Sequence, residues 1–168
     1  MKQYAETQKD TLVVGLGEMH VTRNSSAVLT CLGLGSCISV CAYDPVSKVG
    51  GMDHIVLPNS EGRNGTSSSK YADTAIPMLI DELNKEGAKK NRLIIKLVGG
   101  AEMSLAPGIT SAFKIGAKNI VSVKEAIARE NLKIATEDIG GHHGRTVRLF
   151  MDSGKVIVTT AGADVKEL

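Results

Sequence analysis

The sequence predicts a single mixed α/β domain in which two amphipathic helices pack against a mostly antiparallel or mixed sheet. Short runs rich in β-branched residues recur along the chain, and two apolar stripes with helical spacing lie between them. With 168 residues, of which 42% are hydrophobic, the chain is long enough for one well-cored domain and rather short for two.

Six runs are typical of strands because Val, Ile, Leu and Thr dominate them and turn residues bound several of them. These runs are 11–14, 38–43, 51–56, 93–98, 146–150 and 155–159. We expect the last two to form a hairpin that turns through 152–154, because Asp, Ser and Gly favour tight turns.

The first helix is indicated by apolar residues at positions 72, 75, 76, 79, 80 and 83, an i, i+3, i+4, i+7 stripe. Pro77 interrupts this stripe, so the helix either kinks there or begins late with Thr74 as its cap. A second apolar pattern over 120–127 predicts a helix that ends near Asn131.

The domain is expected to span residues 11–160, between a flexible N-terminus at 1–10 and a C-terminal tail at 161–168. A polar, Gly/Ser-rich segment at 59–69 predicts a mobile loop, which either borders a site or is a plain connector. The first ten residues lack the apolar run of an export signal, and no later run approaches transmembrane length. We therefore expect a cytoplasmic protein that does not insert into a membrane.

Composition argues against several classes of function. The formal net charge of +2, from 20 basic and 18 acidic residues, is not typical of a nucleic-acid-binding protein. Three cysteines, Cys31, Cys37 and Cys41, include no CxxC pair, which argues against a disulfide framework and a common zinc site. His142 and His143 have no Asp, Glu or Cys at a recognisable ligand spacing. We therefore predict no metal and no other cofactor.

The segment 32–40 is the part of the chain most indicative of chemistry. Two glycines and a serine lead into a strand at Cys37, so the backbone can turn tightly and bring a substrate close to the thiol. A single cysteine near a turn can equally be a small core residue.

His54 strengthens the catalytic interpretation because it lies in the next predicted strand. If the two strands pair as an antiparallel hairpin, Cys37 and His54 come side by side. An imidazole beside a thiol lowers the thiol pKa and then serves as the acid for a leaving amine. The structural alternative is a strand histidine hydrogen-bonded to a backbone carbonyl.

A series of motifs runs in one order from Val13 to Val158. They are Gly33-Leu34-Gly35-Ser36-Cys37, Tyr43-Asp44-Pro45, His54-Ile55-Val56-Leu57-Pro58, Lys70-Tyr71-Ala72-Asp73, Val98-Gly99-Gly100-Ala101, Asn119 and Gly140-Gly141-His142-His143-Gly144-Arg145. This order resembles that of the CheD family of bacterial chemotaxis proteins, which are chemoreceptor glutamine deamidases.

The resemblance implies that Cys37 is the nucleophile and His54 the base, because the family's spacing is kept (54 − 37 = 17). It also implies a three-layer α/β sandwich related to the deamidating domain of cytotoxic necrotizing factor toxins. The implied substrates are glutamines on the cytoplasmic helices of methyl-accepting chemoreceptors. The implied regulatory partner is CheC, a phosphatase of the response regulator CheY.

One position departs from the family's pattern. The family places a threonine six residues before the nucleophile as a third catalytic group, whereas Cys31 stands there in this chain and Thr30 comes one step earlier. Adjacent strand residues face opposite sides, so both cannot point into the site without a bulge. Either Cys31 takes the threonine's role as the third catalytic residue, or only its backbone carbonyl is needed to orient the imidazole. A thiol is a weak hydrogen-bonding group, so we favour the carbonyl.

The expected reaction forms a thioester between Cys37 and the glutamine side chain, releases ammonia and leaves glutamate after hydrolysis. Backbone N–H groups of Gly35, Ser36 and Cys37 are the predicted donors to the oxyanion. Two alternatives remain: another Cys/His thiol enzyme, such as a protease or transamidase, and a non-catalytic chemotaxis regulator that binds CheC or receptors.

Overall fold

The computed structural model describes residues 10–61, 68–103, 114–163 and 165–168. Within them the chain forms two α-helices, α1 (Ala72–Lys85) and α2 (Ile115–Arg129), and a short 3-10 helix (Lys90–Arg92). The strands of these residues are β1 (Asp10–Val13), β2 (Met19–Thr22), β3 (Ala27–Leu34), β4 (Ile38–Asp44), β5 (Val49–Ile55), β6 (Ile94–Gly99), β7 (Ile134–Ile139), β8 (Arg145–Phe150), β9 (Lys155–Thr160) and β10 (Val165–Glu167).

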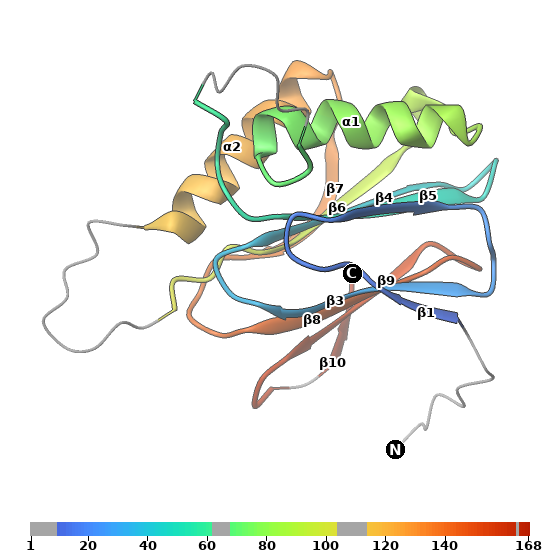
Figure 1. The fold of residues 1–168 in the computed structure, drawn as a ribbon. Coiled ribbons are helices and arrows are strands. Elements are labelled where there is room, and N and C mark those ends of the chain that lie inside the picture. The colour runs from blue at the N-terminus through green and yellow to red at the C-terminus, as the bar shows by residue number, and fades with distance from the viewer. Residues whose placement is uncertain (1–9, 62–67, 104–113, 164) are drawn as a thin grey trace, which may run out of the picture.

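The elements form three layers, as Figure 1 shows: two helices, a sheet beneath them, and a second sheet beneath the first. The upper sheet has the order β2-β5-β4-β6-β7, and the lower sheet has the order β1-β3-β8-β9-β10. The pairs β1–β3 and β6–β7 are parallel, whereas the other neighbouring strands run antiparallel. The predicted three-layer α/β sandwich with mixed sheets is therefore confirmed.

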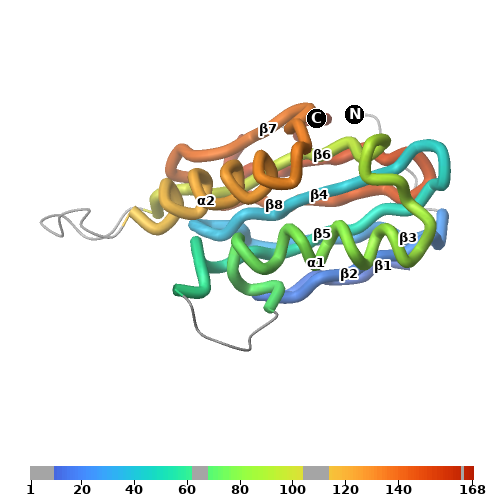
Figure 2. The backbone as a smooth tube through the Cα atoms, turned by 90° about the horizontal axis from the view of Figure 1, so that it is seen from above, coloured from blue at the N-terminus to red at the C-terminus, as the bar shows by residue number. Residues whose placement is uncertain are grey.

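Two apolar layers hold the sandwich together. Because side chains alternate along a strand, β4 sends Ile38, Val40 and Ala42 toward the helices. It sends Cys41 and Tyr43 toward the lower sheet. Figure 2 shows α1 and α2 lying side by side across the upper sheet, with α1 over β5 and β2 and α2 over β4. All seven residues of β4 are consequently buried.

Of the strands missed by the sequence patterns, β2, β7 and β10 lie at sheet edges, whereas β3 is an inner strand with an irregular end. β7 is an edge strand with three exposed residues, so its apolar pattern is weak. β10 lies in the predicted tail 161–168 and pairs with β9 at an edge of the lower sheet. The predicted hairpin is confirmed as β8 and β9. The predicted N-terminus lies outside the described residues up to residue 9, as does the 62–67 part of the predicted loop.

Of the two alternatives for the first helix, a kink at Pro77 or a late start, the late start is wrong. α1 begins at Ala72 and runs through Pro77, which lies on the exposed side of the helix. A proline on this side keeps its ring in solvent rather than against the sheet, and the helix continues beyond it. Thr74 is therefore not the cap, and its hydroxyl donates to the Tyr71 carbonyl. The second helix ends where Asn131 adopts a positive φ of 56°.

Candidate functional site

Cys37 lies in the bend between β3 and β4, at the edge of the layer between the two sheets. Its side chain is half-buried and packs against that layer. The approach to the bend is irregular, because the pairing of β3 with β8 shifts register between Cys31 and Leu34. Gly33 has a φ of 60° there, a left-handed conformation that glycine adopts at little cost. The thiol is thus placed at the start of a strand and within reach of solvent.

His54 shares a face of the upper sheet with Cys37. In the antiparallel pair of β4 and β5, His54 lies directly opposite Ser39, two residues beyond Cys37. Cys37 directly precedes the paired part of β4, and its packing against the layer between the sheets puts it on the side of the upper sheet that His54 also faces. The hairpin expected from the sequence is confirmed, and it sets the thiol and the imidazole on one face.

The His54 ring is anchored through one nitrogen. Its side chain is only 3% exposed, and Nδ1 lies 3.1 Å from the Val14 carbonyl oxygen. A carbonyl only accepts hydrogen bonds, so Nδ1 donates and Nε2 carries the lone pair of the neutral ring. Burial lowers the pKa of His54, and the Val14 hydrogen bond partly offsets this. Among the described residues, Nε2 has no hydrogen-bond partner, which leaves it free to take a proton.

The carbonyl that orients His54 differs from the one expected. Sequence analysis assigned this role to Cys31, whereas the structure supplies Val14 from the end of β1. Val14 is itself fixed, because its N–H donates to the Thr30 carbonyl at 2.8 Å. The sequence carries no signal for this contact, since every residue has a carbonyl and β1 is far from His54 along the chain.

Cys31 and Thr30 face opposite sides of β3. The Cys31 side chain points into the layer between the sheets, where its Sγ lies 3.3 Å from Met52 Sδ. Thr30 is buried on the other side of the strand, and its hydroxyl has no hydrogen-bond partner within the described residues. The bulge follows Cys31, so it does not turn the Thr30 hydroxyl into the site.

The three free cysteines differ in burial. Burial raises the pKa values of Cys31 and Cys41 to about 12. Burial also raises the pKa of half-buried Cys37, although its own backbone N–H partly offsets this. The sequence led us to expect a lowered pKa from the imidazole, whereas burial shifts the pKa of Cys37 upward. The shifts of Cys37 and His54 both favour the uncharged form of each group.

The backbone before β4 is held by the segment that ends and follows β6. The Gly35 carbonyl accepts from the Ala101 N–H at 2.9 Å, and the Cys37 carbonyl accepts from the Gly100 N–H at 2.8 Å. Gly99 packs so closely on the Cys37 carbonyl that a Cβ would collide with it. Gly99 and Gly100 therefore mark a close backbone approach beside Cys37.

Comparisons with known proteins show the family of this chain. Residues 56–160, more than half of the chain, match the family model described as CheD chemotactic sensory transduction. A probable chemoreceptor glutamine deamidase CheD from Symbiobacterium thermophilum is 43% identical, over 92% of this chain and 95% of the relative. The chemoreceptor glutamine deamidase CheD from Thermotoga maritima is 42% identical, over 93% of this chain and 98% of its own.

The chain belongs to the CheD family. Neither Val14 nor Ser39 belongs to the motifs that suggested this family from the sequence. Ser39 is fully buried opposite His54, and Asn119 is fully buried behind the Cys37 bend. Asn119 is among those motifs, but its position in an amphipathic helix gave no indication of its contacts.

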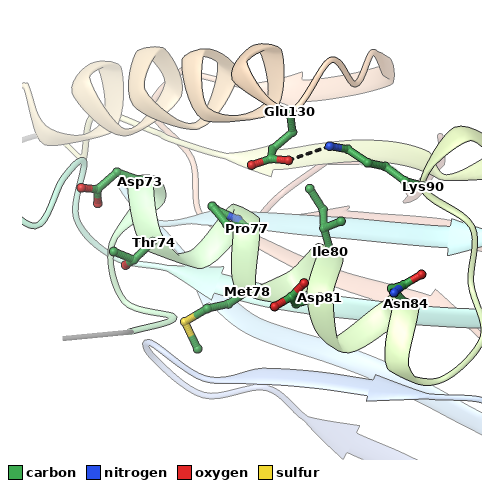
Figure 3. A pocket seen from close by; sticks show the side chains of 9 residues that line it. All are labelled: Asp73, Thr74, Pro77, Met78, Ile80, Asp81, Asn84, Lys90 and Glu130. Atoms are coloured by element: carbon green, nitrogen blue, oxygen red, sulfur yellow. Dashed lines mark hydrogen bonds and ion pairs between the residues drawn. The ribbon is translucent and has the colours of Figure 1, made fainter. Parts of the chain in front are cut away.

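A groove also lies on the helix layer of this CheD-family chain, away from Cys37 and His54, as Figure 3 shows. It has a volume of about 690 Å³ and is lined by Asp73, Thr74, Pro77, Met78, Ile80, Asp81, Asn84, Lys90 and Glu130. Lys90 and Glu130 form an ion pair of 2.7 Å there. The lining includes neither a thiol nor an imidazole, so the chemistry expected of Cys37 and His54 belongs elsewhere.

The described part of the chain offers no group of three or more His, Cys, Asp or Glu side chains that could hold a metal ion. His142 instead places Nδ1 2.9 Å from the Glu102 carbonyl. No helix among the described residues is long and apolar enough to cross a lipid bilayer.

Proposed function

We propose that this chain is a chemoreceptor glutamine deamidase in which Cys37 attacks the glutamine side chain and His54 moves the protons. One observation carries the proposal: the β4–β5 pairing sets a solvent-reachable thiol and a carbonyl-anchored imidazole on the same face. The reaction is the one named for the Symbiobacterium and Thermotoga relatives.

The reaction starts from an uncharged thiol and an uncharged imidazole. His54 Nε2 takes the thiol proton as Cys37 Sγ bonds to the carboxamide carbon, and the carbonyl oxygen becomes negatively charged. The N–H groups of Ser36 and Cys37 stabilise this oxyanion. The imidazolium then gives its proton to the nitrogen, the C–N bond breaks, and ammonia leaves a thioester on Cys37.

The second half of the reaction restores the enzyme. A water molecule gives a proton to His54 Nε2 and attacks the thioester carbon. The imidazolium returns the proton to sulfur as the C–S bond breaks, which leaves glutamate on the substrate and a thiol on Cys37. Water is the only co-reactant, so the reaction needs no metal or redox group.

Exposed apolar side chains surround the entrance to this site and suit a protein substrate. Leu16, in the segment around His54, is 70% exposed, and Leu32, in the irregular part of β3, is 52% exposed. Met103 is 51% exposed and contacts Gly35. We propose that together they act as an apolar rim that holds the apolar side of a receptor helix while a neighbouring glutamine enters.

A direct test uses cytoplasmic receptor fragments incubated with the purified protein in heavy-oxygen water. Mass spectrometry should map glutamate at particular glutamines, with one heavy oxygen at each converted site. The Cys37→Ala variant should convert none. Conversion by that variant at the wild-type rate would reject the mechanism, whereas cleaved or cross-linked fragments would favour the protease or transamidase alternative.

The rim also suggests how a CheC-type partner would act, since a partner that covers Leu16, Leu32 and Met103 would exclude the receptor. Labelled receptor fragment and CheC should therefore displace each other in a binding titration. Simultaneous binding of both, with neither weakened, would contradict competition and leave only an indirect effect of CheC.

A further inference from the structure

A buried amide joins the two strand ends that carry Cys37 and His54. Asn119 lies on α2 and is fully buried. Its Nδ2 donates to the Ser36 carbonyl at 2.9 Å and to the Val56 carbonyl at 3.0 Å. Ser36 is two residues before β4 begins and Val56 directly follows β5, so one side chain holds both ends of the hairpin.

The hydrogen bond to Ser36 also fixes the direction of the next N–H group. In a trans peptide the carbonyl of one residue and the N–H of the next point in opposite directions. With its oxygen held toward α2, the Ser36–Cys37 peptide directs the Cys37 N–H away from α2.

We infer that Asn119 is a positioning residue that holds the Ser36–Cys37 peptide so that the Cys37 N–H points at the oxyanion of the intermediate. The inference rests on the proposed function, in which Cys37 is the nucleophile. The neighbouring carbonyls of Gly35 and Cys37 are held by backbone N–H groups, which substitution does not readily remove. The Ser36 carbonyl between them is instead held by a side chain, that of Asn119.

The reach of Asn119 is set by close packing of its helix. A Cβ on Gly116, one turn earlier in α2, would lie only 2.5 Å from the Gly100 carbonyl oxygen. The helix backbone therefore lies directly on the segment whose N–H holds Cys37. This packing leaves Asn119 little freedom to move away from Ser36.

The rate at which iodoacetamide alkylates Cys37 shows whether a substitution misplaces only the oxyanion donor or damages the whole site. Alkylation displaces iodide from a carbon atom and forms no oxyanion, so it requires the thiolate but not the aimed N–H group. Deamidation requires both. A positioning role therefore predicts that deamidation slows while alkylation does not.

The experiment compares Asn119→Leu, which has a similar size but no donor, with Val123→Ala, one turn further along α2 and equally buried. In Asn119→Leu we expect kcat to fall on the order of 10- to 100-fold, with KM and the alkylation rate within about twofold of wild type. Val123→Ala should leave all three nearly unchanged. If Asn119→Leu does not fold, Asn119→Asp keeps the shape with at most one donor, and the same split is expected.

Two outcomes would overturn the inference: a kcat loss no larger than that of Val123→Ala, or an alkylation rate that falls in parallel with kcat. Cys37→Ala, assayed beside them, distinguishes the two levels of the argument. If Cys37→Ala still deamidates, the proposed function fails and the inference with it. If Cys37→Ala is inactive while Asn119→Leu is fully active, only the role of Asn119 is wrong.

Discussion

Cys37 and Cys41 lie on the same face of β4, yet the fold gives them different chemistry. Cys37 is half-buried at the entrance to the layer between the sheets. Cys41 lies deep inside it, where it is 1% exposed and its Sγ lies 3.8 Å from Ser39 Oγ. Burial raises the pKa of Cys41 to about 12, so this thiol stays protonated. Depth within the layer, rather than residue type, decides which cysteine can react.

The two faces of β5 differ in a similar way at consecutive residues. His54 faces the lower sheet and has the Val14 carbonyl as its partner. Asp53 lies opposite Val40, on the face that packs against the helices. It is fully buried, and neither carboxyl oxygen has a hydrogen-bond partner among the described residues. Burial raises the pKa of Asp53 to about 8, so this carboxyl holds its proton at neutral pH.

The largest expected effect separates the two cysteines. Cys37→Ala should lower the deamidation rate more than about 1,000-fold, because the nucleophile is removed. Cys41→Ala should keep kcat within about twofold and lower the free energy of unfolding by about 1 kcal/mol, because a buried sulfur is lost from the core. Rates from mass spectrometry and unfolding in urea measure the two effects. The reverse pattern would place the reactive thiol inside the layer.

The imidazole gives the next largest effect. His54→Gln should lower kcat by roughly 100- to 10,000-fold, because general acid–base catalysis is lost. His20→Gln is the matched control, since His20 is exposed on β2, the strand that pairs with β5. Equal activities of the two variants would show that His54 only packs.

The pH dependence follows from the two shifted groups of the site. Burial raises the pKa of Cys37, so its alkylation rate should rise about tenfold per pH unit, with a midpoint above about pH 8.5. Burial lowers the pKa of His54, so deamidation should decline only as pH falls below about 6.5, when the ring gains a proton. A thiol alkylated with a midpoint near neutral pH would instead indicate a preformed thiolate–imidazolium pair.

Asp53 should make the free energy of unfolding depend on pH between about 4 and about 8. An unfolded Asp loses its proton near about pH 4, whereas folded Asp53 holds it to about 8, so the folded state binds more protons between these values. The free energy of unfolding should therefore contain a component that decreases as pH rises through this window. Urea unfolding of wild type and Asp53→Asn measures it, and the difference between the two should vanish below about pH 4.

The smallest effects are expected at the position that departs from the family's pattern. Cys31→Thr should retain or improve the deamidation rate, Cys31→Ala should lower it little, and Thr30→Val should hardly change it. All three rates should stay within about threefold of wild type, because none of these side chains belongs to the reacting groups. Deamidation rates at matched folded fractions measure these changes. A large loss in Thr30→Val would show that its hydroxyl reaches the site despite the side on which it lies.

The sequence predicted the parts of the fold whose side chains repeat with a clear period. β4, β5, β6, β8 and β9 carry dense apolar runs, and both helices carry apolar stripes. β2 and β10 have too few residues for such a pattern, and β3 includes the irregular stretch at Gly33. Local periodicity therefore predicts the central strands better than the edges.

The candidate site was predictable where side chains carry the chemistry. Residue type and a single hairpin made Cys37 and His54 candidates, and the family resemblance supplied their expected roles. The Val14 carbonyl was not predictable, because a backbone group has no sequence signature and reaches His54 only through the packing of the two sheets. Asn119 could not be assigned for a similar reason, since a polar residue in a helix ordinarily faces solvent.

The dependence of His54 on Val14 has a consequence for newly made chains. Val14 comes just after β1, which pairs in parallel with β3 in the lower sheet, while His54 belongs to the upper sheet. The β4–β5 hairpin is a local structure and can form early, but the imidazole is oriented only when the first strand has docked and the sheets have closed. A partly folded chain would hold a cysteine without an aligned base, so glutamine chemistry begins only once assembly is complete.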